Sequence, residues 1–168
     1  EEVIDVVRYN VRQQYNCKYK LNLFTAYETR IQNIVFTGIK KGVFEEAKFD
    51  SDPELVFARI LEQDNDVKNW LRPASSQFNI TYNHGHRYEP DFVVEAEDMI
   101  YLVEVKGEDR IEREDVVAKK ERAIRYCKAV SEWGRANGYK QWQYVFIPSG
   151  EVHSNSSFGQ LARRFGEK

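Results

Sequence analysis

The chain lacks the features that would place it in a membrane or in an oxidising compartment. None of its apolar runs is long enough to span a bilayer, and its first residues carry no signal-peptide pattern. The two cysteines, Cys17 and Cys127, lie far apart and without metal-ligand spacing, so we expect free thiols in the reducing cytoplasm. A glycine-rich phosphate loop is also missing, which argues against ATP binding by these residues.

An excess of positive charge is absent as well. The formal net charge is −2 and the isoelectric point is near 6.0. A protein that holds DNA by itself through many phosphate contacts is usually basic. We therefore expect that, if the chain acts on DNA, another domain supplies most of the affinity. Glu1 stands where a complete protein would have methionine, which favours a domain taken from a larger protein.

The composition is typical of one globular domain with an α/β fold. The 168 residues are 42% hydrophobic and 31% charged, enough for one core and too few for two full domains. Ile31, Ile34 and Val35 recur in a helical phase, and residues 3–7 are typical of a strand. The other predicted elements are a helix from Asp52 through Leu61, extended segments at 70–73 and 78–82, a hairpin at 92–103, a helix at 114–137 and a strand at 142–147. This order predicts a mixed central sheet flanked by helices.

The hairpin carries the most informative motif of the chain. Two apolar runs, 92–96 and 99–103, flank the polar pair Glu97-Asp98, which is typical of two strands joined by a two-residue turn. With that turn, Asp91 falls opposite Glu104, and Lys106 points to the same face as Glu104. Two carboxylates and one ammonium on one patch indicate a metal site with a lysine beside it.

A structural explanation of the same motif stays open. Asp91 would then be a turn residue after Pro90, and Glu104 and Lys106 would be solvated positions of an edge strand. The apolar neighbours of Glu104 argue for a strand that is buried on at least one face, where unpaired charge is costly.

Pro90-Asp91 with Glu104-x-Lys106 resembles the signature of the PD-(D/E)XK nuclease superfamily. A wider set of blocks resembles the C-terminal nuclease domain of type III restriction enzyme-like helicase subunits. These blocks are Phe36–Lys41, Phe49–Glu54, Trp70–Ala74, Gln77–Ile80, Tyr88–Phe92, Ala118–Glu121 and Trp142–Pro148. The resemblance divides the chain into a restriction endonuclease-like core at 34–150, an N-terminal extension or linker at 1–33 and a C-terminal tail at 151–168.

The resemblance implies a metal-dependent DNA endonuclease. Mg²⁺, for which Mn²⁺ can substitute, would be held by Asp91, Glu104 and the backbone carbonyl of Val105, because hard cations prefer oxygen ligands. Lys106 would orient or help to deprotonate the attacking water and steady the phosphate. The sequence does not decide between one metal ion and two.

Glu54 is a further candidate for the metal site. It shares one helical stripe with Phe57, Ala58 and Leu61, so its side chain is expected to face the core. Position alone also fits an ordinary glutamate in the first turn of a helix, where the helix dipole favours an acid. In PD-(D/E)XK domains a glutamate from a helix before the hairpin joins the metal cluster, which implies that role for Glu54. Glu62 is the reserve candidate.

Basic residues of the long helix are candidates for DNA contacts. The resemblance puts Lys119 in the block that lends a polar residue to the site, and Lys120, Arg122 and Gln77 are added as DNA-binding candidates. The alternative for the helix residues is an ordinary solvated face. His84, His86 and His153 lack a nearby cysteine or third histidine, so we expect no zinc site there.

The resemblance also implies a biological setting. The chain would be the cleavage module of a cytoplasmic restriction or antiviral defence enzyme, joined to helicase or translocase domains of the same chain and working with a modification subunit. Two alternatives stay open. One is an inert nuclease fold that positions DNA or assembles a complex, and the other is a stand-alone repair nuclease or resolvase.

Overall fold

A five-stranded mixed sheet forms the centre of the computed structural model, which describes residues 18–78, 80–82, 85–107 and 114–167. β7 and β8 run parallel, and the other neighbouring strands are antiparallel. The strands follow the order β3 (Val67–Leu71), β6 (Phe92–Ala96), β7 (Met99–Lys106), β8 (Gln141–Pro148) and β9 (Gly166–Glu167). The predicted α/β fold with a mixed central sheet is confirmed.

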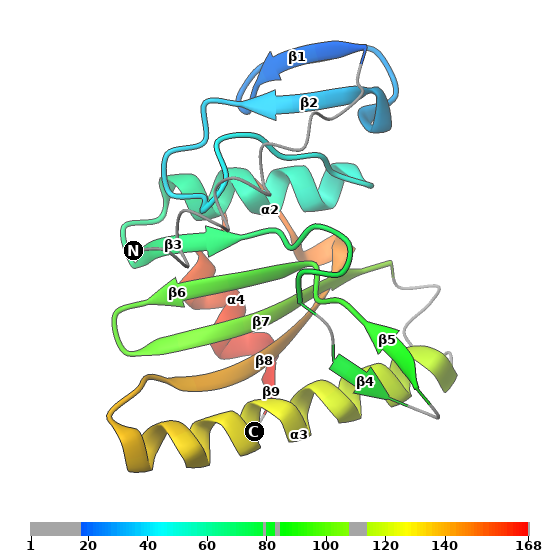
Figure 1. Cartoon of the computed structure of the whole chain (residues 1–168). Helices are drawn as coiled ribbons and strands as arrows, with labels where there is room; N and C mark the ends of the chain where they lie inside the picture. Colours follow the sequence, from blue (N-terminus) through cyan, green and yellow to red (C-terminus); the bar gives the residue numbers. More distant parts are fainter. Residues whose placement is uncertain (1–17, 79, 83–84, 108–113, 168) are drawn as a thin grey trace.

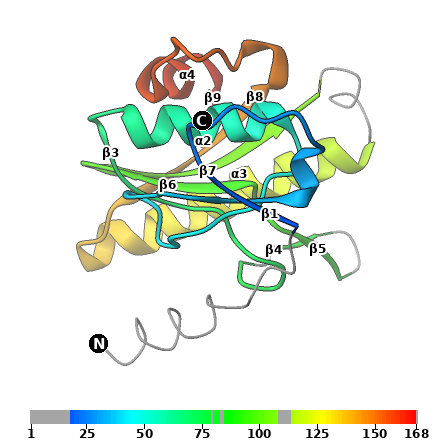
Figure 2. The same ribbon diagram turned by 90° about the horizontal axis from the view of Figure 1, so that it is seen from above.

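Helices cover both faces of this sheet (Figures 1 and 2). α3 (Glu114–Asn137) packs on one face, and α2 (Asp52–Gln63) and α4 (Phe158–Phe165) pack on the other. α3 also connects β7 to β8, because two parallel strands need a crossover between them. Gly138, with φ +75°, follows the last residue of α3 in the left-handed conformation that ends many helices. None of the helices in the described ranges is both long and apolar enough to cross a membrane.

Two small sheets stand beside the central one. β1 (Tyr19–Asn22) and β2 (Ile34–Thr37) form a parallel pair above α2 in Figure 1. β4 (Ile80–Tyr82) and β5 (His86–Tyr88) form an antiparallel pair that packs against α3. Two short 3-10 helices, η1 (Ile31–Asn33) and η3 (Ser149–Glu151), complete the described elements.

The helical phase predicted at Ile31, Ile34 and Val35 is wrong. Only the single turn η1 is helical there, and β2 begins directly after it. Ile34, Val35 and Phe36 are all fully buried, so this segment is enclosed on both faces as a covered strand is. Three consecutive apolar residues fit such a strand as well as a helical stripe, and pairing with β1 decided the outcome.

The chain after Pro148 packs into the domain, although no helix or strand was predicted there. Ser157 and Gln160 form a reciprocal capping box at the start of α4. Phe158, Leu161 and Ala162 are buried in the same core as α2. The strand-like segment predicted at 3–7 lies outside the described residues.

The other predicted elements are found close to their predicted bounds. The helix predicted from Asp52 is α2, although the side chain of Ser51 makes no capping hydrogen bond. β6 and β7 pair with Phe92 opposite Val103, the register that the two-residue turn predicts. On α3 the buried residues include Val116, Ala123, Cys127 and Ser131.

Candidate active site

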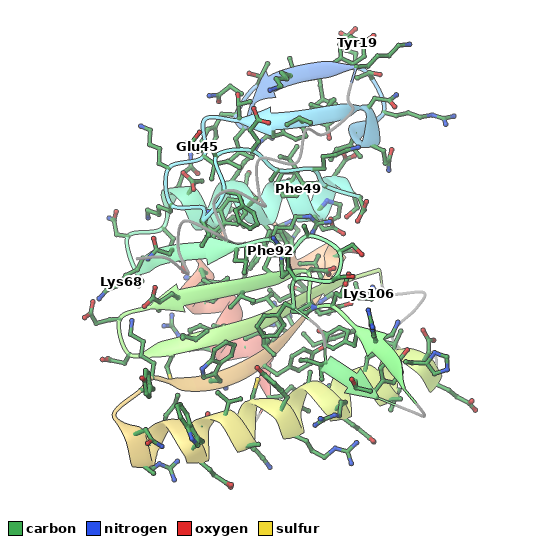
Figure 3. The ribbon with its side chains drawn as sticks, viewed as in Figure 1. Tyr19, Glu45, Phe49, Lys68, Phe92 and Lys106 are labelled. Carbon is green, nitrogen blue, oxygen red and sulfur yellow. The ribbon has the colours of Figure 1, made fainter. Side chains whose placement is uncertain are left out.

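The candidate site lies at the end of the sheet where β7 finishes. Asp91 directly precedes β6, and continuing the β6–β7 register by one residue places it opposite Glu104. Side chains alternate along a strand, so Glu104 and Lys106 share the face of Leu102, which packs in the cluster under α3. Figure 3 shows Lys106 at this end of β7, beside β5.

Glu104 is the most tightly held acid of the site. It is only 5% exposed, and each of its carboxylate oxygens accepts one hydrogen bond. Lys106 Nζ donates to Oε1 over 2.9 Å, and the Tyr88 hydroxyl donates to Oε2 over 3.0 Å. Both donors keep the carboxylate in one orientation at the end of the strand.

Asp91 is a partly buried acid that is difficult to ionise. Its Oδ2 accepts a hydrogen bond from the backbone N–H of Val105 over 2.9 Å. Burial, followed by the charge of Glu104, raises the pKa of Asp91 to about 7, against the lowering effects of Lys106, Val105 and Arg72. For Asp91, burial and the repulsion from Glu104 therefore outweigh the attraction of Lys106 and Arg72.

Lys106 is an ammonium in this environment. Burial lowers its pKa, but the charge of Glu104 and its hydrogen bond outweigh that effect, and the pKa of Lys106 is raised from its ordinary value. A lysine that holds its proton this firmly acts as a donor and a positive charge. It is poorly suited to remove a proton from water.

Glu54 is buried, as its place in the helical stripe predicts, and is 7% exposed. Its Oε2 accepts a hydrogen bond from the backbone N–H of Asp50 over 3.0 Å and forms an ion pair with Arg72 Nη2 over 2.8 Å. Arg72 Nη2 also donates a hydrogen bond to Asp50 Oδ2 over 2.9 Å. Burial raises the pKa of Glu54, Arg72 lowers it, and the nearby charge of Asp91 raises it further. Glu54 thus lies within electrostatic reach of the hairpin acids but is held by an arginine.

Arg72 rests on an aromatic platform. Its guanidinium carbon lies 5.4 Å from the ring centre of Phe49 and 5.5 Å from that of Phe92. Both rings are drawn next to each other in Figure 3. Within the described residues Arg72 Nη1 is buried without a hydrogen-bond partner, so the ring faces are its main surroundings.

The reserve candidate Glu62 serves the fold instead. Its carboxylate accepts hydrogen bonds from the backbone N–H groups of Lys40 and Lys41 and from Trp70 Nε1. Through these three bonds, Glu62 on α2 holds the loop at Lys40 and Lys41 next to β3, and none of them involves the hairpin acids.

The hairpin acids have the chemistry of a site for one hard cation. Among the described residues, no three His, Cys, Asp or Glu side chains are grouped as a complete metal site. Asp91 and Glu104 are nevertheless close enough for the charge of one to raise the pKa of the other. A divalent cation relieves such repulsion, and Mg²⁺ commonly takes one or two carboxylates and completes its shell with water. The donor set therefore fits Mg²⁺.

The predicted DNA-binding residues are engaged in local contacts. Lys119 pairs with Asp115, and Lys120 pairs with Glu167. Arg122 Nε donates to the carbonyl of Thr81 over 2.8 Å, and Gln77 accepts from the backbone N–H of Ala74. The structure thus puts Lys119 and Arg122 on α3 against the β4–β5 hairpin, and their role in DNA binding stays a prediction.

The histidines form no cluster in the part of the chain that is described. His86 is exposed on β5 and lies near the ring of Tyr82, and His153 is exposed far away in sequence. His84 lies outside the described residues. 

Sequence reasoning missed two residues that contact the acids directly. Tyr88 stands three positions before Asp91, but the direction of its hydroxyl depends on how the β4–β5 hairpin packs. Arg72 lies in one of the blocks that carry the resemblance, yet its pairing with Glu54 joins β3 to α2. The sequence signal was proximity to the motif for Tyr88, and for Arg72 its place in one of the blocks that carry the resemblance.

A family model described as an endonuclease domain matches residues 40–143, which is more than half of the chain. The chain therefore belongs to the endonuclease domain family. The match includes Glu54, Arg72, Tyr88 and the hairpin acids. No curated protein matches the chain. Membership defines a nuclease-type domain, a hydrolase class, and implies DNA as its substrate.

Proposed function

We propose that the chain is a Mg²⁺-dependent DNA endonuclease domain that hydrolyses phosphodiester bonds at the end of β7. The observation that supports this most strongly is the pair Asp91 and Glu104 with Lys106 beside it, inside the region matched by an endonuclease family. A nuclease needs negative charge to bind a cation and positive charge to stabilise the phosphate, and this cluster supplies both.

Asp91, Glu104 and the backbone carbonyl of Val105 would hold Mg²⁺, and Mn²⁺ would substitute for it. When bound, the ion supplies Lewis-acid stabilisation of the phosphate and a more acidic water. Glu54 is proposed as a further acid of the site, either as a direct ligand or through its charge. Its bond to Arg72 supports the second of these roles.

Lys106 would orient the attacking water and stabilise the negative charge that grows on the phosphate. Its raised pKa supports a donor role over that of a base. Because Glu104 Oε1 accepts from Lys106, the acid also fixes the position of the ammonium. The two residues would thus orient each other before substrate arrives.

The same proposal extends to the setting of the domain. A net charge of −2 suits a cleavage module that other domains deliver to DNA. We propose that helicase or translocase domains of the full-length chain and a modification subunit do so, as part of cytoplasmic restriction or antiviral defence.

The experiment is a cleavage assay on supercoiled plasmid with Mg²⁺ or Mn²⁺, at high protein concentration and with chelator controls. We expect metal-dependent nicking that Asp91→Ala abolishes. The matched control is Asp98→Ala, because Asp98 is an exposed acid at the other end of the same hairpin. If wild type neither cuts DNA nor binds a divalent ion in calorimetry, the proposed function is wrong. Binding without cutting would identify the inert module instead.

A further inference from the structure

The side chain of Tyr88 is an unusual neighbour for a proposed metal ligand. Tyr88 is 3% exposed and ends β5, a strand of the small sheet that packs on α3. Its hydroxyl donates to Glu104 Oε2 over 3.0 Å, and both groups are buried. The bond therefore joins the β4–β5 hairpin to the catalytic end of β7.

Glu104 depends on this bond for the oxygen that Lys106 does not engage. A buried carboxylate oxygen without a donor is costly, and a donor that fixes it also fixes the direction of the other oxygen. Lys106 Nζ is the end of a flexible side chain, whereas the Tyr88 ring is locked in a packed cluster with Leu102 and Phe146. Tyr88 is thus the rigid one of the two donors.

We infer that Tyr88 is a positioning residue of the nuclease site, which orients the Glu104 carboxylate for a divalent cation. The inference rests on the proposed function for the identity of the ligand. It assigns to Tyr88 a role that packing alone would not give it. Burial and the charge of Glu104 hold the pKa of Tyr88 well above its ordinary value, so the hydroxyl keeps its proton and remains a donor.

The chain offers a control against the same cluster. Tyr126 of α3 packs against it, and no hydrogen bond among those of the described residues joins its hydroxyl to Glu104. Tyr144 is less suitable, because a hydrogen bond with Tyr88 couples the two hydroxyl groups. Tyr88→Phe and Tyr126→Phe therefore remove the same group from tyrosines of one cluster, and only the first removes a donor from the carboxylate.

The test is Mn²⁺ binding, measured by calorimetry and electron paramagnetic resonance on wild type, Tyr88→Phe and Tyr126→Phe. Loss of a residue that orients a metal ligand typically weakens metal affinity by about 10- to 100-fold. We expect at least about a tenfold rise in Kd for Tyr88→Phe and a change below about threefold for Tyr126→Phe. A folded Tyr88→Phe protein that binds Mn²⁺ as wild type does overturns the inference.

A second measurement separates positioning from general packing and needs no metal. We compare the loss in melting temperature caused by Tyr88→Phe in wild type and in a Glu104→Leu background. The loss should be larger in wild type, where the substitution leaves a buried carboxylate oxygen of Glu104 without a donor, than in the Glu104→Leu background, where there is no carboxylate. Failure of Tyr88→Phe to fold, with rescue by Glu104→Leu, supports the inference. Equal losses in both backgrounds, or failure to fold in both, overturn it.

The outcomes also separate this inference from the proposed function. If wild type binds no Mn²⁺ at all, the proposed function and the positioning role fail together. If wild type binds Mn²⁺ and loses it with Asp91→Asn, but Tyr88→Phe has no effect, only the inference about Tyr88 fails.

Discussion

Two regions of the molecule bury carboxylates, and they differ in the cations that compensate the negative charge. In the first, Glu54 faces Arg72 over 2.8 Å, and the guanidinium rests on Phe49 and Phe92. In the second, Asp91 and Glu104 share the single ammonium of Lys106. In the first region Arg72 Nη2 also contacts Asp50 over 2.9 Å, but the side chain of Asp50 is 84% exposed, so only one buried acid relies on the arginine. The second region has two acids beside one lysine.

This contrast indicates where a further cation would bind. Arg72 offsets part of the effect of burial, which raises the pKa of Glu54, and removal of either partner leaves an unpaired charge. In the second region burial and, after it, the charge of Glu104 raise the pKa of Asp91, and a bound cation would relieve this repulsion. The same sheet end therefore combines a balanced ion pair that supports the fold with an unbalanced one that suits a metal.

The largest effect should come from Lys106→Ala. The ammonium cannot ligate Mg²⁺, so metal affinity should stay close to that of wild type or rise slightly. The rate of DNA cleavage should fall by a factor of about 10² to 10⁴, because a positioned donor to the transition state is lost. Single-turnover cleavage at saturating Mg²⁺ measures this loss.

Lys68→Ala is the matched control, because Lys68 pairs with Glu97 at the exposed turn of the same hairpin (Figure 3). Cleavage by Lys106→Ala within a few-fold of wild type would mean that Lys106 is a surface residue of the strand with no role in the reaction.

Arg72→Leu tests the balanced region. Removing the arginine leaves Glu54 buried without its partner, and we expect the free energy of unfolding at pH 7.5 to fall by about 3 kcal/mol. Urea denaturation measures the change. The double variant Glu54→Leu/Arg72→Leu should recover most of the loss, since an apolar pair can replace a buried ion pair. A double variant no more stable than the single one contradicts the account of this region.

Asp91→Asn tests the unbalanced region without metal. The folded pKa of Asp91 is raised to about 7 from 3.8, so the folded protein keeps a proton that the unfolded chain has lost at intermediate pH. The contribution of Asp91 to the free energy of unfolding is therefore fully present below about pH 4 and is lost as pH rises toward 7. Across that window the free energy of unfolding changes by at most about 1.4 kcal/mol for each pH unit.

We expect metal-free Asp91→Asn to be more stable than wild type by about 2 kcal/mol at pH 8 and equal to it near pH 4. Urea denaturation in chelator across this range measures the difference. If the difference in free energy of unfolding between Asp91→Asn and wild type did not change with pH, the pKa of Asp91 would not be perturbed by burial and by Glu104.

The smallest effects should come from the DNA-binding candidates on α3. Lys119→Ala or Arg122→Ala should weaken DNA binding less than about tenfold. Each should also lower by about one the number of counterions released on binding, which is obtained from the slope of log K against log salt concentration. Fluorescence anisotropy at several salt concentrations measures both quantities. Arg135→Ala, an exposed arginine at the far end of the same helix, is the control. Equal losses in all three variants would assign the effect to net charge.

The hairpin was predictable because local rules determine it. A two-residue turn sets the register of both strands, so the placement of Asp91 opposite Glu104 followed from counting. The start of α2 was predictable for the same reason, since Pro53 and an acid in the first turn are local signals of a helix N-terminus. The burial of Glu54 followed from its helical stripe.

The residues that hold these acids could not be predicted in the same way. The bonds from Tyr88 to Glu104 and from Arg72 to Glu54 join elements that only tertiary packing brings together. The β1–β2 pair and α4 were missed for a similar reason. A run of buried residues such as Ile34–Phe36 loses its periodicity when it is covered on both faces, and α4 owes its place to contacts of Phe158 with the core.

The most direct test of the central claim is the stabilisation of the folded protein by Mg²⁺. An ion that binds only the folded cluster adds about 2.7 kcal/mol at one hundred times its dissociation constant. Differential scanning calorimetry at pH 7.5 should show this rise in wild type and in Asp98→Asn, and Asp91→Asn should lose most of it. An equal rise in wild type and Asp91→Asn would mean that Mg²⁺ binds elsewhere, and would contradict the assignment of the metal site to Asp91 and Glu104.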